Sequence, residues 1–426
     1  MNKVKIGDIA TVYDGPHATP NKIEEGPIYL GLEGITDDGR FNPSGFAHLS
    51  EEDYAVWTRR VTPQEDDIVF SYEATLGRYV LIPKGFYGCL GRRLGIVRCD
   101  KTKVNPRWLY YFFLSPEWTR FTQSHKVRGS TVDRLSVDDF PGYEIPLPSL
   151  DVQNRTVSAI FPIDQKIDLN IRLCTELEAM AKTLYDYWFV QFDFPDENGK
   201  PYRTSGGAME WCQELGRAAP KGWKIDTIDH IISIVRGVSY QPSDELSSLD
   251  EDSIKLLKSN NIQDGSINFD SPVYLPSEKA NNEQWLTKGS VFITMSSGSK
   301  LHMGKTAIVF DDLPYVFGAF CAKIRIESLY QYWLAVFFRH ELFRTHIENV
   351  TLGTSINNIN AHHITSIKMA FPPKEILEQF NAVLSPCFDM QGKIMKENTQ
   401  LQNMRDWLLP MLMNGQSIVK QKGEAK

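Results

Sequence analysis

The most constraining feature of this sequence is a long apolar seam between residues 160 and 188. Apolar side chains recur there in alternating steps of three and four residues, interrupted by one alanine and by Asn170. This spacing is the 3.5-residue period of a coiled-coil seam. Because no proline or glycine lies between Pro162 and Pro195, we expect a helix from about residue 164 to residue 190. At ~1.5 Å per residue it would be roughly 40 Å long, with Pro162 in its first turn.

The same seam occurs a second time, shifted by 224 residues and more polar in its middle. We therefore predict two copies of one unit, each a lobe followed by a long helix. The two helices are expected to pair antiparallel in a pseudo-symmetric molecule. The seam residues are Ile160, Ile163, Ile167, Asn170, Leu177 and Leu184 in the first copy, and Leu384, Ile394, Asn398, Leu401 and Leu408 in the second.

The two asparagines in these seams leave two interpretations open. A buried asparagine in a coiled-coil seam costs stability but fixes the register of the helices. A solvent-facing asparagine on a loosely packed stretch fits Asn170 and Asn398 equally well.

The residues before each helix are predicted to form a β-rich lobe. Short apolar segments such as Ile28–Leu32 and Tyr79–Ile82 are separated by turn residues. One amphipathic helix is expected over residues 107–122. The predicted class is α+β, with two lobes separated by the two long helices. The predicted boundaries are 1–150 for the first lobe, 151–193 for its helix, 194–219 for a linker, 220–375 for the second lobe, 376–415 for its helix and 416–426 for a disordered tail.

Cysteine usage and the absence of targeting signals indicate a reduced, cytoplasmic protein. The six cysteines form no C-x-x-C pair, and the first ten residues lack the apolar core of a signal peptide. The longest aromatic-aliphatic run, Trp108–Leu114, is far shorter than the ~18 residues that a membrane span needs.

The distribution of charge points to an anionic partner, although the net charge of −7 does not. Residues 1–77 contain six Lys and Arg against fourteen Asp and Glu, whereas residues 78–134 contain twelve against three. The second copy repeats this trend more weakly. We interpret the segregation as a sign that the C-terminal half of each lobe binds an anion such as nucleic acid.

The sequence gives no positive sign of catalysis or of a metal site. Gly298 to Thr306 resembles a phosphate-binding loop, but five residues separate its glycines where the motif needs four. His362 and His363 are adjacent, so their rings cannot share one face as metal ligands normally do. We therefore predict no catalytic and no metal-binding residues.

Two pairs of polar loops at matched positions are candidates for DNA contact. Glycine lets the backbone approach a ligand, hydroxyl groups bond phosphates, and Arg and Asn read guanine and adenine edges. A turn or a helix N-cap favours the same residue types, so the chemistry alone leaves both interpretations open. The candidates are Ser71, Arg78, Lys126, Arg128, Ser130, Thr131 and Arg134 in the first lobe, and Ser296, Lys300, Lys305, Thr354, Ser355, Asn357 and Asn358 in the second.

The order and duplication of these motifs resemble the specificity subunit of Type I restriction-modification enzymes. Similar stretches are Lys5-Ile6-Gly7-Asp8-Ile9 and Pro220-Lys221-Gly222-Trp223 at the lobe openings, Ile145-Pro146-Leu147-Pro148 at a lobe end, Ile167-Asp168-Leu169-Asn170 in the first helix, and Leu408 to Gly415 at the end of the second. The resemblance spans nearly the whole chain. One departure is Pro410, which lies in the last turn of the second helix and has no counterpart in the first. The two helices therefore need not end alike.

The resemblance implies a DNA reader that has no active site of its own. Each lobe would be a target-recognition domain for one half of a bipartite, asymmetric target in double-stranded DNA, and the conserved helices would set the gap between the halves. Two DNA methyltransferase (modification) subunits and endonuclease/translocase (restriction) subunits would be the partners. S-adenosylmethionine, ATP and Mg would be bound only by those partners, and this chain would need no cofactor. Two other hypotheses remain: a two-lobed coiled-coil adaptor that binds protein without touching DNA, and a stand-alone DNA methyltransferase, which the missing motifs oppose.

Overall fold

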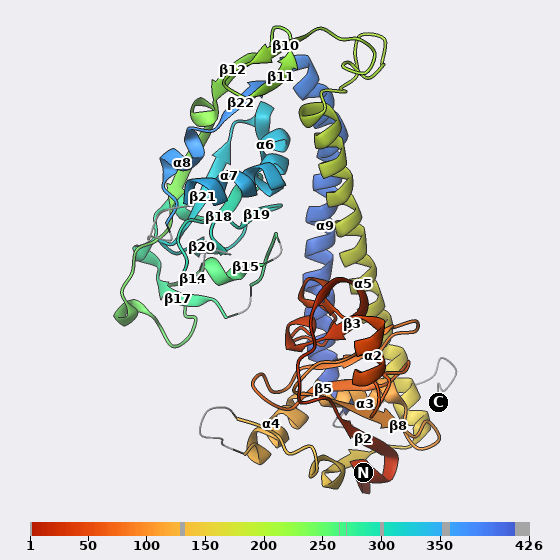
Figure 1. The fold of residues 1–426 in the computed structure, drawn as a ribbon. Coiled ribbons are helices and arrows are strands. Elements are labelled where there is room, and N and C mark those ends of the chain that lie inside the picture. Colours follow the sequence, from red (N-terminus) through yellow and green to blue (C-terminus); the bar gives the residue numbers. More distant parts are fainter. Residues whose placement is uncertain are drawn as a thin grey trace, which may run out of the picture. The chain divides into compact units, whose positions relative to one another are not determined.

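The computed structural model describes residues 2–127, 133–263, 265–269, 271–298, 302–351 and 358–413, and of Asn2 only the backbone. The chain divides into two compact units. Unit 1 consists of residues 1–169 and 398–426, and unit 2 consists of residues 170–397. Each unit holds one lobe and part of each long helix (Figure 1). The predicted disordered tail, 416–426, lies outside the described residues.

Lobe 1, in unit 1, is built from three small sheets and four short helices. Its four-stranded antiparallel sheet has the order β2 (Ala10–Asp14), β8 (Leu94–Cys99), β5 (Ile68–Ser71), β6 (Tyr79–Leu81). A three-stranded sheet has the order β4 (Ala47–His48), β3 (Ile23–Leu30), β7 (Gly88–Leu90), and β1 (Asn2–Lys5) pairs with β9 (Glu144–Leu147). The helices are α1 (Ile6–Ile9), α2 (Glu51–Trp57), α3 (Pro106–Phe113) and α4 (Pro116–His125).

Lobe 2, in unit 2, repeats these sheets strand for strand. The four-stranded sheet runs β13 (Ile232–Arg236), β21 (Cys321–Ile326), β18 (Val291–Thr294), β19 (Thr306–Ile308). The three-stranded sheet runs β17 (Val273–Pro276), β14 (Ser253–Leu257), β20 (Tyr315–Phe317), and β12 (Lys224–Thr227) pairs with β22 (Lys368–Phe371). Its helices are α6 (Gln331–Arg339), α7 (Glu341–Thr351) and α8 (Ala361–Thr365). The same pairs of strands are parallel, β3 with β7 and β14 with β20. The predicted duplication is therefore confirmed.

Two further hairpins belong to unit 2. One is β15 (Ile262–Gln263) with β16 (Ser266–Ile267), and the other is β10 (Met209–Cys212) with β11 (Arg217–Pro220). The second hairpin lies within the predicted linker. At the start of that segment Phe194 is buried and stacks on Tyr202 and Trp223, so the connection is packed against the unit.

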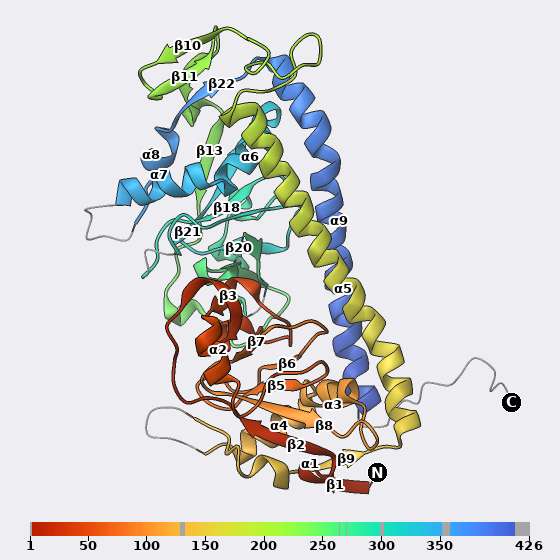
Figure 2. The same ribbon diagram turned by 45° about the vertical axis from the view of Figure 1, so that its right-hand side comes forward.

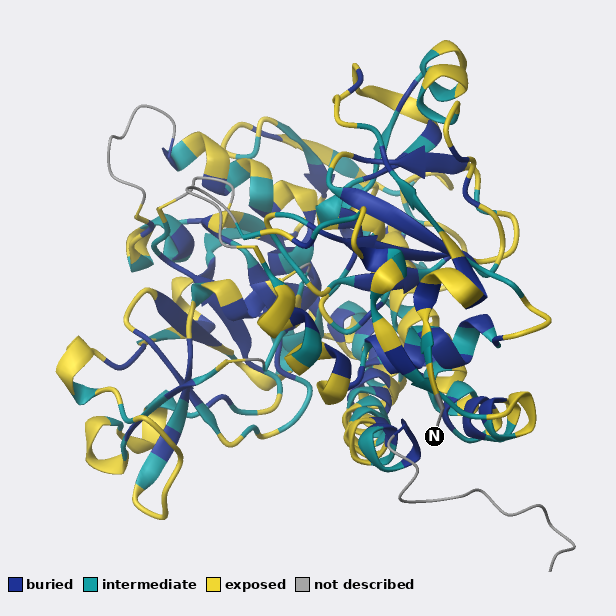
Figure 3. Cartoon of the chain, turned by 90° about the horizontal axis from the view of Figure 1, so that it is seen from below, coloured by how far each residue is buried: buried dark blue, intermediate teal, exposed yellow. Residues whose placement is uncertain are grey.

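Aromatic side chains fill the core of each lobe between the four-stranded sheet and the helices that follow it. In lobe 1, Trp118 is buried, and its indole N–H donates to the hydroxyl of Tyr79 at 2.7 Å. In lobe 2, Trp333 is buried against the rings of Phe189 and Phe371. Figure 3 shows that buried residues gather on strands and on inward helix faces, whereas exposed residues follow the loops.

The single helix predicted over residues 107–122 is wrong, because two helices, α3 and α4, occupy this segment. The Ser115 hydroxyl accepts a hydrogen bond from the Trp118 amide, so it caps a new helix, and Pro116 stands in the first turn of that helix. A proline disfavours helical geometry in the residue before it, which ends α3 at Phe113.

The first long helix begins about fourteen residues before its expected start near residue 164, whereas both helices lie close to the predicted segments 151–193 and 376–415. Helix α5 covers Leu150–Tyr185 and continues as a π-helical turn over Asp186–Val190, and α9 covers Lys374–Met413. Pro162 therefore lies inside α5 and not in its first turn, which corrects the prediction. The earlier residues are helical because packing requires it: Gln153, Val157 and Ile160 are buried against lobe 1. With 36 and 40 residues, the helices are about 54 and 60 Å long.

Within each unit the two long helices are antiparallel (Figure 2). In unit 1, Arg405 of α9 bonds Asp164 of α5 at 3.3 Å. In unit 2, Asn170 donates to Glu397 at 2.7 Å, and Gln391 donates to the backbone oxygen of Cys174 at 3.4 Å. Asn170 is buried, which favours a buried seam asparagine over a solvent-facing one at this position. Among the described seam residues none is exposed. Within the part of the chain that the structure describes, no helix is both long and apolar enough to cross a lipid bilayer.

Candidate nucleic-acid interface

In lobe 1, three segments meet beyond the ends of β5 and β8. They are the 72–78 loop, the 91–93 turn, and Val127 with residues 133–135; we call them loop cluster 1. The Tyr72 amide donates to the Arg93 backbone oxygen at 3.2 Å, and the Leu135 amide donates to the Tyr72 backbone oxygen at 2.8 Å. Glu73 and Arg134 form an isolated antiparallel bridge. Three loops that are distant in sequence are thereby held side by side.

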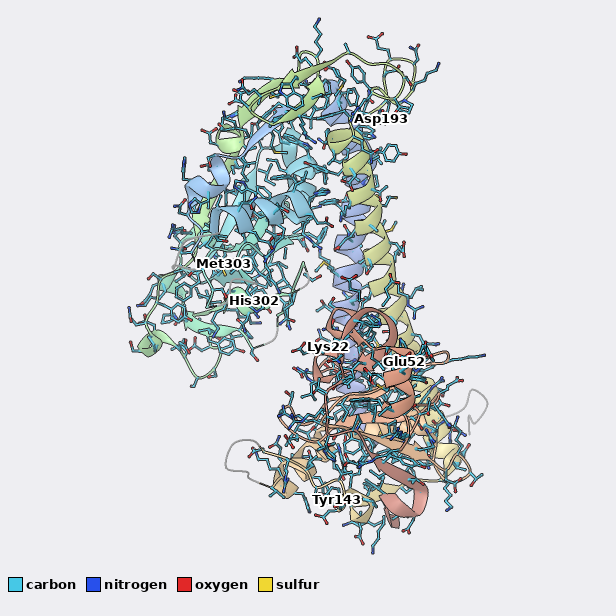
Figure 4. The ribbon with its side chains drawn as sticks, in the orientation of Figure 1. Lys22, Glu52, Tyr143, Asp193, His302 and Met303 are labelled. Carbon is cyan, nitrogen blue, oxygen red and sulfur yellow. The ribbon has the colours of Figure 1, made fainter. Side chains whose placement is uncertain are left out.

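In lobe 2, the equivalent segments meet in the same way. Loop cluster 2 consists of residues 295–298 and 302–305, the 318–320 turn, and residues 358–359. The Met295 amide donates to the Phe320 backbone oxygen at 2.8 Å, and the Ile359 amide donates to the Met295 backbone oxygen at 2.7 Å. Ser296 and Asn358 form the bridge. Figure 4 labels His302 and Met303 in the segment between β18 and β19. One backbone frame thus occurs twice.

Ser71 and Arg78 lie at the base of loop cluster 1 and are engaged internally. The Ser71 side chain is fully buried and accepts a hydrogen bond from the Arg78 amide at 3.0 Å. The Arg78 guanidinium donates to Asp37 at 2.6 Å and to the Leu32 backbone oxygen at 2.8 Å. A side chain buried in this way positions the loop, so we do not retain Ser71 as a DNA contact.

Other predicted contacts lie on the surface of the clusters. Arg134 and Asn358 are exposed, and their side chains have no hydrogen bond or ion pair with another described residue. Lys126 is half-buried and pairs with Asp133 at 2.8 Å. Lys305 precedes β19 as Arg78 precedes β6, and Ser296 is half-buried. Seven further candidates lie outside the described residues: Arg128, Ser130, Thr131, Lys300, Thr354, Ser355 and Asn357.

The segregation of charge in the sequence is in part an internal pairing in lobe 1. Acidic residues before position 78 pair with basic residues from position 78 onward in ion pairs of 2.6 to 3.1 Å. The pairs are Asp37 with Arg78, Glu73 with Arg93, Asp67 with Arg98, and Asp66 with Lys101. Because these charges neutralise one another, the segregation of acidic and basic residues in the sequence supports an anionic partner less strongly than the residue counts alone suggest. Arg92, Arg120 and Arg134 are exposed cations without an ion pair to another described residue.

The electrostatics of loop cluster 1 favour hydrogen bonding over acid–base chemistry. Burial, and after it the carboxylate of Asp14, raises the pKa of Tyr72 far above its usual value, so its hydroxyl stays protonated. Asp14 also accepts from His17 at 2.7 Å. Among the described residues no group of three or more His, Cys, Asp or Glu is placed to hold a metal ion. The clusters offer donors, acceptors and one exposed aromatic ring.

Residues 1–179 match the family described as Type I restriction modification DNA specificity domain. A relative that aligns over almost the whole chain is the Type I restriction enzyme MjaIX specificity subunit of Methanocaldococcus jannaschii. It is 24% identical, and the alignment covers 98% of this chain and 93% of the relative. Over almost its whole length this chain is therefore similar to a Type I specificity subunit.

Two more comparisons found proteins that are similar to this chain. The Type I restriction enzyme EcoKI specificity subunit of Escherichia coli K12 is 30% identical over 208 residues. That match covers 47% of this chain and spans only 44% of the EcoKI subunit's length. The crystal structure of the S subunit from M. genitalium superposes with a TM-score of 0.54 at 13% identity, covering 97% of this chain and 96% of that one, so the two share the fold.

Sequence reasoning missed two residues that lie inside the loop clusters. Arg93 and Phe320 occupy equivalent places, because their backbone oxygens accept from Tyr72 and Met295 respectively. The offset between the copies is 223 residues at Tyr72 and Met295 but 227 at Arg93 and Phe320, since the 295–305 loop is four residues longer than the 72–78 loop. A search that allowed for this insertion would have aligned them.

Proposed function

We propose that this chain is the non-catalytic DNA-recognition subunit of a Type I restriction-modification enzyme. Each lobe reads one half of a bipartite, asymmetric double-stranded target. The observation that carries the proposal is the repeated loop frame: the backbone bonds of loop clusters 1 and 2 are the same, whereas the side chains that they present differ. Two lobes that share a backbone frame but present different side chains suit a DNA target whose two halves differ in sequence.

The exposed face of the long helices supports docking of partner subunits. Leu173, Met180 and Tyr187 are exposed and spaced by seven residues, so they share one face of the first helix, and Val383 and Met390 have the same spacing on α9. An outward apolar row on a helix whose other face is already buried suits another protein. We assign it to methyltransferase subunits, with endonuclease subunits joining them in the cytoplasm. S-adenosylmethionine, ATP and Mg are bound by those partners.

Salt-dependent duplex binding tests the proposal. The purified chain, alone and with its methyltransferase subunits, is titrated with a duplex that carries sites methylated in the host genome. The affinity should fall linearly on a log–log plot as salt increases, because phosphate contacts release counterions. A protein adaptor would show no such slope and no preference for the target. The chain alone should neither methylate nor cleave DNA, and methyl transfer without the partner subunits would overturn the proposal.

A further inference from the structure

The loop clusters place different chemistry on three matched backbone positions. In each cluster one residue comes from the turn before β8 or β21, one from the loop after β5 or β18, and one from the segment before β9 or α8. We call these two sets trio 1 and trio 2. Trio 1 is Arg93, Glu73 and Arg134, and trio 2 is Phe320, Ser296 and Asn358.

Trio 2 holds an aromatic ring outward on a fixed backbone. The Phe320 backbone oxygen accepts from the amides of Met295 at 2.8 Å and Ser296 at 3.0 Å, so its position is set by two bonds. Its side chain is nevertheless 68% exposed and contacts no other ring among the described residues. On the other side of Ser296, Asn358 is exposed without a hydrogen-bond partner for its side chain among those residues.

These two side chains together match one base pair. Asparagine bonds the N6 and N7 atoms of adenine, and a phenylalanine ring packs against the 5-methyl group of thymine. Both features lie in the major groove, and both belong to A·T pairs. A guanine or cytosine edge would leave the ring of Phe320 against polar atoms and offer Asn358 a poorer partner.

Trio 1 presents the opposite chemistry at the same places. Arg134 is exposed, and its side chain has no partner among the described residues. Arg93 forms an ion pair with Glu73, with 3.1 Å between Nε and Oε1. Arginine bonds the O6 and N7 atoms of guanine bidentately, and a glutamate accepts from the N4 amino group of cytosine. The three groups that replace Phe320, Ser296 and Asn358 therefore suit G·C pairs.

We propose that trio 1 reads a G·C pair in one half-site and that trio 2 reads an A·T pair in the other, both from the major groove. The inference rests on the proposed function and specifies which bases each lobe selects. Single exposed apolar residues are common on protein surfaces, and Trp211 and Leu249 are two others in unit 2. What distinguishes Phe320 is its place in the loop frame, so Trp211 serves as the control.

The test for trio 2 removes one methyl group from the DNA. In the duplex target, each thymine of one half-site is replaced in turn by deoxyuridine, and binding to the full chain with its methyltransferase subunits is measured. Deoxyuridine at one of these positions should weaken binding about fourfold, which corresponds to the free energy of burying one methyl group. In the Phe320→Ala variant that substitution should change nothing, because the two changes remove the same contact. Trp211→Ala should remain as sensitive to deoxyuridine as the unchanged chain.

The test for trio 1 uses 7-deazaguanine, which lacks the N7 acceptor. Replacing one particular guanine in the other half-site with 7-deazaguanine should weaken binding about tenfold, since a bidentate contact discriminates between bases by ~1–3 kcal/mol. The Arg134→Ala variant should be insensitive to that replacement and still sensitive to deoxyuridine in the opposite half-site. Because Arg134 and Phe320 are exposed, both variants should keep the unfolding temperature of the parent chain.

The outcomes separate this inference from the proposed function. If the parent chain binds no duplex preferentially, the proposed function fails. If it binds its target but tolerates deoxyuridine and 7-deazaguanine at every position, or if Phe320→Ala and Arg134→Ala stay as sensitive as the parent, DNA recognition stands and the assignment of the trios is overturned.

Discussion

The carboxylate of Asp164 joins lobe 1 to both long helices within unit 1. It accepts from the guanidinium of Arg40 at 3.0 Å, from the hydroxyl of Tyr111 at 2.7 Å and from Arg405 at 3.3 Å. Burial, followed by this carboxylate, raises the pKa of Tyr111 well above its usual value. The side chains of Asp164 and Arg405 are only 16% and 10% exposed, so water cannot replace a lost partner.

Replacing Asp164 with alanine should destabilise unit 1 strongly. Among the described residues it leaves the buried Arg405 with only the exposed Asp406 as an ion-pair partner, and removing one member of a buried pair costs about 3–5 kcal/mol. Urea unfolding, followed by hydrogen exchange of the β5 and β8 amides, measures the change. Asp151→Ala is the matched control, because the Asp151 side chain is 67% exposed in its pair with Arg155 and the pair should contribute less than about 1 kcal/mol. Equal losses would show that the Asp164 network adds nothing.

Two buried cysteines should be inert in the folded chain. Burial raises the pKa of Cys89 and Cys321 to about 12, from 9.0, so almost no thiolate is present at pH 8. Alkylation by iodoacetamide, located by mass spectrometry, should be slow in the native protein and fast in urea. Because the folded state holds these protons more tightly, the free energy of unfolding should fall as pH rises from about 9 towards 12. Equal native and unfolded rates at Cys321 would contradict the prediction.

At the scale of elements, we predict that the helix pair sets the gap between half-sites, and lengthening both helices tests this. Lobe 1 contacts α5 up to Asp168, and lobe 2 contacts α9 as far as Lys396, which pairs with Asp311. Insertions after Leu169 and after Glu397 therefore keep these contacts and the Asn170–Glu397 bond. Seven residues in each helix preserve the seam and add roughly 10 Å.

The variant with both insertions should fold, bind its partner subunits and lose the original target. Any new target should keep both half-sequences and have a gap longer by about three base pairs, at ~3.4 Å per step. Sequencing of the sites methylated by the variant complex measures this. Seven residues inserted after Ser205, in the exposed turn before β10, should leave the target unchanged. Undiminished methylation of the original site would mean that something other than the helices sets the gap.

Helices could be predicted from the sequence where a single local pattern determines their position. The heptad seam fixed the middle of both long helices, and Ser115 followed by Pro116 carried a readable signal for a helix start. The start of α5 was not predictable from its seam. Residues 150–159 are helical because Gln153 and Val157 are buried against lobe 1, a contact between distant segments that local periodicity does not contain.

The candidate site was predictable in outline only. The loops around Arg134 and Asn358 were found because both copies align at one offset, and Arg78 and Lys305 were found as cations before a strand. Arg93 and Phe320 were not found, because a four-residue insertion shifts their alignment. Nor does sequence reveal that Ser71 is buried, since its neighbours in space come from elsewhere in the fold.

At the scale of the whole molecule, the two lobes should act independently on DNA. Each loop cluster is held by hydrogen bonds within its own unit, so a change in one cluster leaves the other frame intact. Arg134→Ala should relax recognition of one half-site only, and Asn358→Ala that of the other, each by ~1–3 kcal/mol. Binding to duplexes with single substitutions in each half measures both effects, and their sum should match the double variant. Equal relaxation of both halves by either change would contradict independence.

The division of the chain into units has a consequence for its synthesis on the ribosome. Unit 2 is one continuous stretch, whereas unit 1 is interrupted by it and is completed by residues 398–413. Leu409, Leu412 and Met413 are buried in the same core as Val157 and Ile160. A nascent chain can therefore finish its second lobe while the first still lacks part of its core. The lobe made first is the last to mature, and its loops gain their final support only as the end of the second helix emerges.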